Sequence, residues 1–187
     1  MSSHHIVREN QEPALLIQDF LVLDRFMVDQ LLEWSPTIIT DDYNLDFLLS
    51  EEIKVDVVFS TPPNEFLQEQ ISFLPLNGSF LDSALSYLIS KSYPAVNILC
   101  TEIEDSLVRF AEDINIVAFC KNKRYVFVRS YYEKWKPKGE AVYVDPKCLE
   151  SQEGLRLVGE QSFETENDGF FRLFFCDEKF VCVGEDI

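Results

Sequence analysis

Hydrophobic and polar positions alternate along this chain in two different ways. Over the first two-thirds, apolar runs of strand length are followed by segments whose apolar residues recur every three or four positions, which is typical of helices. We expect strands at 14–20, 36–40, 55–60, 71–76 and 95–100, and helices at 24–34, 44–52, 79–92 and 104–112. Several of these strands are apolar throughout, as parallel strands are when both faces of the sheet are covered. The pattern predicts a three-layer α/β domain with a mostly parallel sheet.

After about residue 113 the helical spacing stops and short strands follow one another. Residues 124–130 alternate strictly, so that Tyr125 and Phe127 are expected on one face and Val126 and Val128 on the other. We expect strands at 114–120, 124–130, 141–146, 154–159, 169–175 and 179–185. This part predicts an antiparallel β-sandwich. A polar, turn-like stretch separates the two patterns and predicts an α/β domain over 1–122 and a sandwich over 123–187.

The charge of the chain excludes some classes of partner. There are 33 acidic and 16 basic residues among 187, which gives a formal net charge of −17. A field of that sign repels nucleic acid and anionic membranes, so we expect neither as a partner. The N-terminus lacks the apolar core of a signal peptide, and no apolar run is long enough to span a membrane. We therefore expect a cytoplasmic protein.

Cysteine and histidine offer little chemistry in this pattern. The five cysteines show no metal-binding spacing, and those in apolar strand-like runs are expected to be buried, reduced thiols; they are Cys100, Cys120, Cys176 and Cys182. Both histidines, His4 and His5, lie in the polar N-terminal tail. Catalysis by a histidine base is therefore not expected.

Three stretches, taken in order, carry a resemblance to a known family. They are TIITDDYNLDFLLSEEIKVDVVFS at 37–60, SFLDSALSYLISKSYPAVNILC at 79–100, and LVRFAEDINIVAFCKNKRYVFV at 107–128 with EKWKPKG at 133–139. In sequence and spacing they resemble thiamine pyrophosphokinase. The resemblance implies an α/β catalytic domain followed by a β-sandwich that helps to hold thiamine. It also implies transfer of a pyrophosphoryl group from ATP to thiamine with Mg²⁺, and a homodimer whose active site lies between subunits.

Most of the acidic motifs that the family uses to bind Mg²⁺ are missing from this sequence. Asp42 matches the aspartate of the family's Asp-Gly motif, but Tyr43 replaces the glycine. The family's Gly-Asp-x-Asp-Ser turn is replaced by Ser60–Asn64, and its Thr-Asp pair by Ser79–Phe80. Hard cations need several convergent oxygen ligands, so we predict no metal site and no cofactor. Asp42 is the one residual catalytic candidate.

The sandwich half retains one candidate for substrate binding. Asn167 matches the second residue of a Ser-Asn pair that the family uses on the thiamine side, although Glu166 replaces the serine. The phenylalanines that follow could stack on a flat ligand, but sandwich core or a dimer contact explains them more simply. The basic stretch Glu133–Gly139 is expected to be a turn with exposed lysines.

Acidic residues near the expected strand ends have structural explanations. Asp41 and Asp42 are expected to cap the helix that follows them, and Asp56 is expected to be a turn or edge residue. Glu102, Glu104 and Asp105 lie where a helix is expected to start, where the helix dipole favours acids.

Three functions follow from this reading. The leading one is a thiamine pyrophosphokinase-like protein that has lost catalysis and serves as a binding or regulatory homodimer, with a thiamine-like or other small cationic ligand. The first alternative is an active thiamine diphosphokinase with Mg²⁺ and ATP bound by rearranged ligands such as Asp42, Glu102 and Glu104. The second alternative is a structural dimer partner of an active paralogue.

Overall fold

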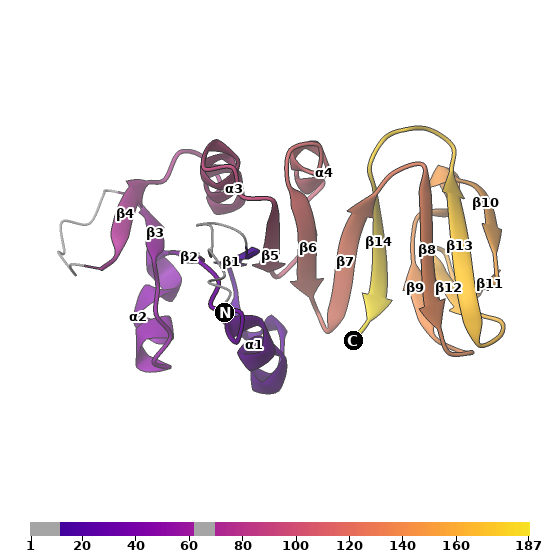
Figure 1. Ribbon diagram of the computed structural model, residues 1–187, viewed down its shortest axis with the longest axis horizontal. Helices are drawn as coiled ribbons and strands as arrows, with labels where there is room; N and C mark the ends of the chain where they lie inside the picture. The colour runs from indigo at the N-terminus through magenta and orange to yellow at the C-terminus, as the bar shows by residue number, and fades with distance from the viewer. Residues whose placement is uncertain (1–11, 62–69) are drawn as a thin grey trace, which may run out of the picture.

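The computed structural model describes residues 12–61 and 70–187, which form one long sheet and a second, smaller one. The long sheet has eleven strands in the order β11-β12-β9-β14-β7-β6-β5-β1-β2-β3-β4, and the small sheet has the order β10-β13-β8. Figure 1 shows the parallel strands with their helices at one end and the second sheet at the other. The predicted fold class, an α/β part followed by an antiparallel sandwich, is confirmed.

The α/β part alternates strands and helices as the sequence pattern predicts. Its strands are β1 (Ala14–Ile17), β2 (Ile38–Asp41), β3 (Val57–Ser60), β4 (Ser72–Pro75), β5 (Ala95–Leu99) and β6 (Asn115–Cys120). Its helices are η1 (Phe20–Val22), α1 (Arg25–Leu32), α2 (Asp42–Ser50), α3 (Phe80–Ser90) and α4 (Leu107–Phe110). The strand expected at 14–20 ends at Ile17, because Asp19 starts the 3₁₀ turn η1 by accepting a hydrogen bond from the backbone of Leu21.

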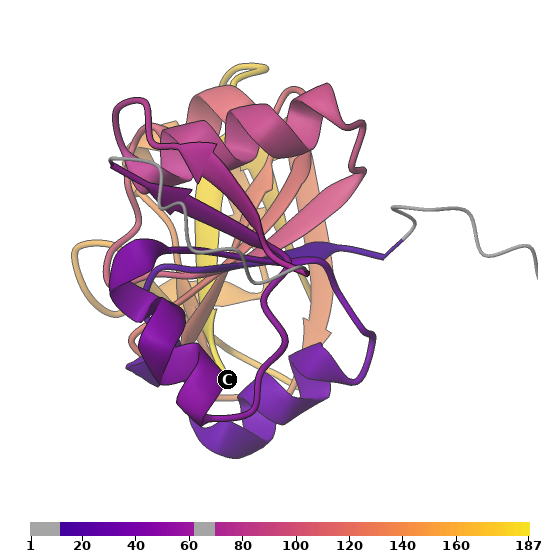
Figure 2. The same cartoon turned by 90° about the vertical axis from the view of Figure 1, so that its left-hand side faces the viewer.

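Helices cover both faces of the parallel strands. Figure 2, viewed along the sheet, shows α1 and α2 on one side and α3 and α4 on the other. Strand residues alternate between the two layers, since Leu15 packs in the core beneath α1 and α2 and Leu16 packs in the core beneath α3. Both side chains are completely buried, which explains why these strands are apolar throughout.

Strand β7 (Lys123–Val128) joins the two halves of the molecule. It pairs antiparallel with β6 through a turn in which Lys121 and Asn122 both have positive φ angles, 51° and 59°. The predicted alternation is seen: Phe127 packs in the core under α3, and Val126 packs against the sandwich core. The long sheet therefore runs without a break across the position of the expected domain boundary.

The sandwich packs the small sheet against the end of the long one. Its further strands are β8 (Tyr131–Lys136), β9 (Ala141–Tyr143), β10 (Leu149–Glu153), β11 (Leu155–Leu157), β12 (Ser162–Thr165), β13 (Gly169–Phe175) and β14 (Val181–Asp186), with the 3₁₀ turn η2 (Pro146–Cys148). The core between the sheets is centred on Phe171 and Leu173, which are 1% and 0% exposed.

The sequence pattern did not predict three strands of the sandwich, which are β8, β10 and β12. The stretch expected to be a basic turn, Glu133–Gly139, lies largely in β8. On the inward face of β8, Lys134 and Lys136 form ion pairs with Glu185 where a strand of a sandwich usually has apolar side chains. Within the described residues, no helix is both long and apolar enough to cross a bilayer.

Candidate functional site

The parallel strands reverse their order at one place in the sheet. From β1 the chain proceeds to β2, β3 and β4 on one side, and after α3 it returns to place β5 and β6 on the other side of β1. In open α/β sheets such a switch leaves a crevice outside the carboxyl ends of the two strands, and ligands bind there. The ends of β1 and β5 are therefore the first place to look for a site.

A cavity of about 480 Å³ lies at this edge. It is lined by residues that follow β1, β2 and β5, namely Gln18, Asp19, Phe20, Leu21, Tyr43, Asn44, Phe47 and Thr101. Its volume is in the range of small-molecule sites. We call it the carboxyl-end crevice.

Two carboxylates and one amide order the segments that form the carboxyl-end crevice. Asp19 accepts the backbone N–H of Leu21 at 2.9 Å and so starts η1. Asp41 starts α2 by accepting the backbone N–H of Asn44 at 3.0 Å. The side-chain amide of Asn44 donates to the Asp41 carboxylate at 2.8 Å and to the backbone carbonyl of Gln18 at 3.1 Å. The end of β1 is thereby tied to the start of α2.

The carboxyl-end crevice has aromatic surfaces and one unsatisfied acceptor. Tyr43 is 89% exposed, and Phe47 packs edge-on against the buried ring of Phe20 with centroids 5.5 Å apart. The side-chain oxygen of Gln18 is buried and has no hydrogen-bond partner among the described residues. A buried acceptor without a partner is costly, so this oxygen is suited to receive a donor from a ligand.

The predicted site residues lie apart from one another. Asp42 is an exposed residue in the first turn of α2, one position before the crevice residue Tyr43. Asn167 lies in the exposed turn between β12 and β13, in the sandwich at the other end of the molecule (Figure 1). Within one chain the structure does not bring them together. The sequence reading missed Gln18, whose position directly after a buried strand was the available signal.

The other acids mostly have the structural roles expected of them. Asp41 caps α2 as predicted. Asp56 accepts the backbone N–H of Ile38 at 3.0 Å and pairs with Lys54 at 2.7 Å, which ties the start of β2 to the start of β3. Glu104 accepts a hydrogen bond from the hydroxyl of Ser106, and α4 itself is shorter than the expected helix.

The described residues do not gather the several oxygen ligands that a Mg²⁺–nucleotide site uses. Over residues 12–61 and 70–187 there is no group of three or more His, Cys, Asp or Glu side chains that could hold a metal ion. The crevice acid Asp19 is engaged in capping, as is Asp41 nearby. The positions 62–64 of the replaced acidic turn, and also His4 and His5, lie outside the described residues.

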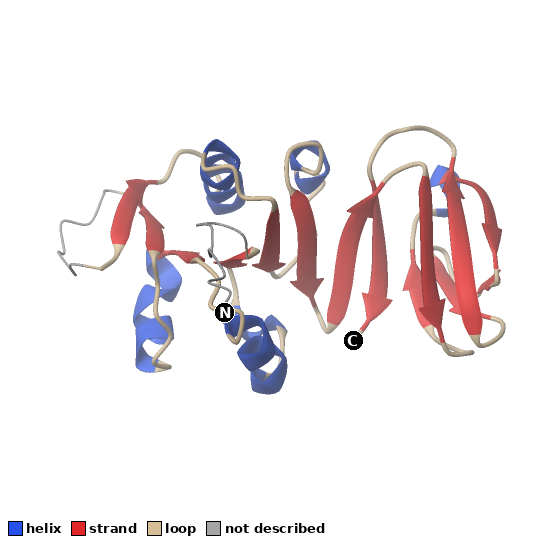
Figure 3. Ribbon diagram, viewed as in Figure 1, coloured by secondary structure: helices blue, strands red, loops and turns tan. Residues whose placement is uncertain are grey.

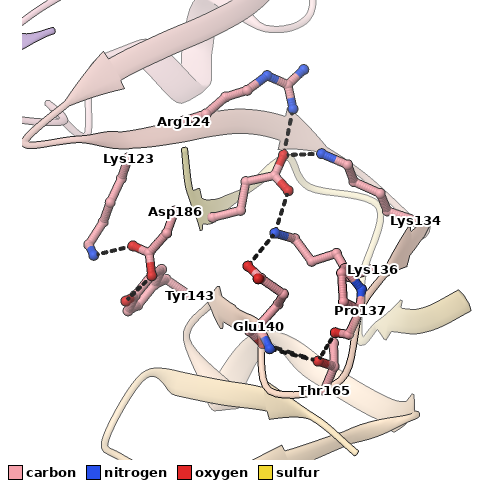
Figure 4. Close-up of polar contacts among 10 residues, drawn as sticks. Lys123, Arg124, Lys134, Lys136, Pro137, Glu140, Tyr143, Thr165 and Asp186 are labelled. Carbon is pink, nitrogen blue, oxygen red and sulfur yellow. Dashed lines mark hydrogen bonds and ion pairs between the residues drawn. The ribbon is translucent and has the colours of Figure 1, made fainter. Parts of the chain in front are cut away.

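The two lysines of β8, Lys134 and Lys136, belong to a partly buried ion-pair cluster, which corrects the expectation of a turn with exposed lysines at these positions. Glu185 of β14 is 7% exposed and accepts hydrogen bonds from Arg124 of β7 and from Lys134 of β8. Lys136, also 7% exposed, lies 3.2 Å from Glu185 and 3.8 Å from Glu140 (Figure 4). We call these residues the Glu185 cluster. The cluster joins β8 of the small sheet to β7 and β14 of the long sheet. Because Arg124, Lys134 and Lys136 are paired with Glu185, they are not free to bind an anionic ligand.

Two of the cysteines, Cys100 and Cys182, are unreactive thiols, and the expected burial is wrong for Cys176. Cys100 and Cys120 are buried as predicted, Cys182 is partly buried, and Cys176 is exposed because it follows β13 at the edge of the sandwich. Burial raises the pKa of Cys100 and of Cys182 to about 12. Both are therefore protonated at neutral pH and are not nucleophiles.

Comparisons with known proteins identify the fold. No protein-family model and no curated protein sequence matches the chain. Thiamine pyrophosphokinase from Bacillus subtilis superposes with a TM-score of 0.67 at 12% identity, covering 93% of this chain and 98% of that one. Yeast thiamin pyrophosphokinase gives a TM-score of 0.66 at 8% identity, covering 98% of this chain and 88% of that one. A protein from Lactobacillus plantarum gives 0.67 at 12% identity over 93% and 97% of the two chains. The chain therefore has the fold of the thiamine pyrophosphokinases over nearly its whole length.

Proposed function

We propose that this protein binds a small, flat organic cation of the thiamine type in the carboxyl-end crevice and does not transfer a pyrophosphoryl group. The observation that carries the proposal is the composition of that crevice. It lies at the switch point of the sheet and has aromatic walls, and both the acid in its lining, Asp19, and the neighbouring Asp41 are engaged in capping. A flat ligand can be bound by such walls, whereas phosphoryl transfer needs free oxygen ligands for a divalent ion.

Charge and aromatic surface both favour a cation. The formal net charge of −17 attracts cations from a distance and repels free nucleotides. At short range, Tyr43 offers an exposed ring, and a cation over such a ring gains about 0.5–1 kcal/mol at exposed sites. The unpaired Gln18 oxygen can accept a hydrogen bond from an N–H group of the ligand.

Calorimetric titration with thiamine tests this proposal. We expect binding without ATP or Mg²⁺, and an affinity about threefold to fivefold lower in Tyr43→Ala, because the exposed ring is lost. Phe26→Ala is the matched control, since Phe26 is a 68% exposed aromatic residue of α1 outside the crevice. Equal losses of thiamine affinity in Tyr43→Ala and Phe26→Ala would show that thiamine does not bind in the carboxyl-end crevice. Release of AMP from thiamine, ATP and Mg²⁺ at enzyme-like rates would reject the non-catalytic function.

We also propose that the protein is a homodimer that pairs through the outer face of the small sheet. On this face the register places Trp135 opposite Phe170 and Tyr131 opposite Phe174. Between these pairs Arg172 bridges Glu133 and Glu153 at 2.7 and 2.8 Å. Aromatic pairs thus flank a charged row on both sides. A twofold axis through the row would match aromatic onto aromatic surface and let Arg172 reach a glutamate of the second copy.

The oligomeric state tests this face directly. Trp135 is 52% exposed and Phe170 is 58% exposed, so replacing either should not disturb the core. We expect Trp135→Glu to shift sedimentation from dimer to monomer, because it places a like charge in an acidic, self-facing surface. Phe26→Glu, on α1, introduces the same charge elsewhere and should leave the dimer intact. A wild-type protein that is monomeric at every concentration would contradict the dimer.

A further inference from the structure

We propose that a second small-molecule site, for an organic ammonium ion with an apolar body, lies between α4 and the sandwich. A cavity of about 460 Å³ is found there, lined by residues of the α4 region, β7, β9, η2 and β14. It shares no lining residue with the carboxyl-end crevice. We call it the seam cavity, because it lies where the helical layer ends and the sandwich begins. The proposal does not depend on the function proposed above.

An incompletely covered stretch of the long sheet forms one wall of the seam cavity. In Figure 3 the helix α4 lies beside β6, and loops rather than helices lie above β7 and β14. On this side Tyr125, Phe180 and Cys182 pack against the core under α3 but remain partly exposed. The apolar surface of these three residues is therefore accessible to an apolar ligand.

The position of the Tyr125 ring depends on a glycine. A Cβ atom at Gly184 would stand 2.5 Å from Cε1 of Tyr125, closer than packed atoms can approach. The ring of Tyr125 therefore rests directly on the backbone of β14, across from its register partner Gly184. This close contact keeps the ring flat against the sheet and makes it part of the cavity wall.

Acidic residues approach the seam cavity from two sides without a counter-ion. Asp105 precedes α4, and Asp145 starts η2 with its carboxylate accepting the backbone N–H of Lys147 at 3.0 Å. Neither carboxylate forms an ion pair with any lysine or arginine of the described residues, and the lining itself contains neither residue type. Two carboxylates without an ion-pair partner, beside an apolar wall, select a ligand that has one positive charge and a hydrophobic body.

The aromatic residues of the seam cavity already attract cations of the protein. Lys123 lies 3.9 Å from the ring centroid of Tyr143, and Arg129 lies 5.1 Å from that of Phe180. Tyr125 has no such partner among the described residues, so its ring is the one left for a ligand. Cys182 contributes apolar surface only, since burial raises its pKa to about 12. The binding is therefore noncovalent.

Titration of the full-length protein with benzyltrimethylammonium, followed by two-dimensional amide NMR, tests the site. We expect saturable shifts at α4, β7, β14 and η2, and at least tenfold weaker binding of benzyl alcohol, which keeps the ring and lacks the charge. Asp105→Asn should weaken binding of the ammonium ion about threefold or more. Glu102→Gln removes the same charge three residues away, outside the lining, and should change affinity by less than about 1.5-fold.

Two further variants separate the cavity from general attraction to an acidic protein. Tyr125→Leu removes the cation–π partner, and Gly184→Ala displaces the ring. Each should weaken binding of the ammonium ion about threefold or more, while a spectrum with native dispersion shows that the fold is kept. Shifts spread over the whole surface, or equal losses in Asp105→Asn and Glu102→Gln, would overturn the site. Shifts confined to the carboxyl-end crevice would likewise overturn it while supporting the function proposed above.

Discussion

Replacing Glu185 with alanine is expected to lower the free energy of unfolding by about 3–5 kcal/mol. The carboxylate is 7% exposed and binds Arg124 at 2.7 Å, Lys136 at 3.2 Å, and Lys134. Removing it leaves three cations together, and Lys136 is itself buried. Both the lost attraction and the repulsion among the cations act in the folded state alone. Urea unfolding followed by circular dichroism measures the change.

The neighbouring Asp186 supplies the control. It is 46% exposed and pairs with Lys123 at 2.7 Å, so Asp186→Asn should cost less than about 1 kcal/mol. A loss at Glu185 no larger than this would show that the Glu185 cluster does not hold the sandwich together.

The Glu185 cluster also makes stability depend on pH. Burial by itself would raise the pKa of Glu185, but hydrogen bonds and charge from Lys134, Arg124 and Lys136 outweigh it, so the folded-state pKa lies below the ordinary value. A carboxylate with a lowered folded-state pKa contributes stability above its unfolded pKa and loses it as pH falls through the folded one. The wild-type protein should therefore lose more stability below about pH 4.5 than Glu185→Gln does.

Replacing Phe171 with alanine is expected to cost about 3–5 kcal/mol. The ring is 1% exposed at the centre of the sandwich core and packs against Tyr132 with centroids 5.9 Å apart. Truncation removes its buried surface and leaves a cavity that the two hydrogen-bonded sheets cannot close. Thermal unfolding should show a lower midpoint with the same cooperativity.

The adjacent residue Phe170 is the matched control for that measurement. It points to the other face of β13 and is 58% exposed. At concentrations low enough to keep the protein monomeric, Phe170→Ala should change the free energy of unfolding by less than about 0.5 kcal/mol. Similar losses at both positions would mean that the sandwich core does not depend on Phe171.

The fold class was readable from the sequence because burial leaves a periodic signal. Strands buried on both faces are apolar throughout, and β7 alternates because its two faces contact different cores. Strand β8 was not readable in this way. Its lysines pair with Glu185, about 50 positions later in the chain, and no local pattern reveals an ion pair whose partner is distant.

The candidate site also has some features that the sequence predicts and others that only the tertiary structure reveals. From sequence alone, two features could be predicted: the missing acids after β3 and before α3, which are read directly from the residues, and the cap formed by Asp41, because capping depends on residues within one turn of a helix. The carboxyl-end crevice and the seam cavity could not be predicted from the sequence. Each is formed by segments that are distant in the chain and that only the order of the strands brings together. The sequence by itself determined the layers and their periodicity, which are short-range properties. The tertiary structure alone decided which acids, rings and cations face one another, because those contacts join residues far apart in the chain.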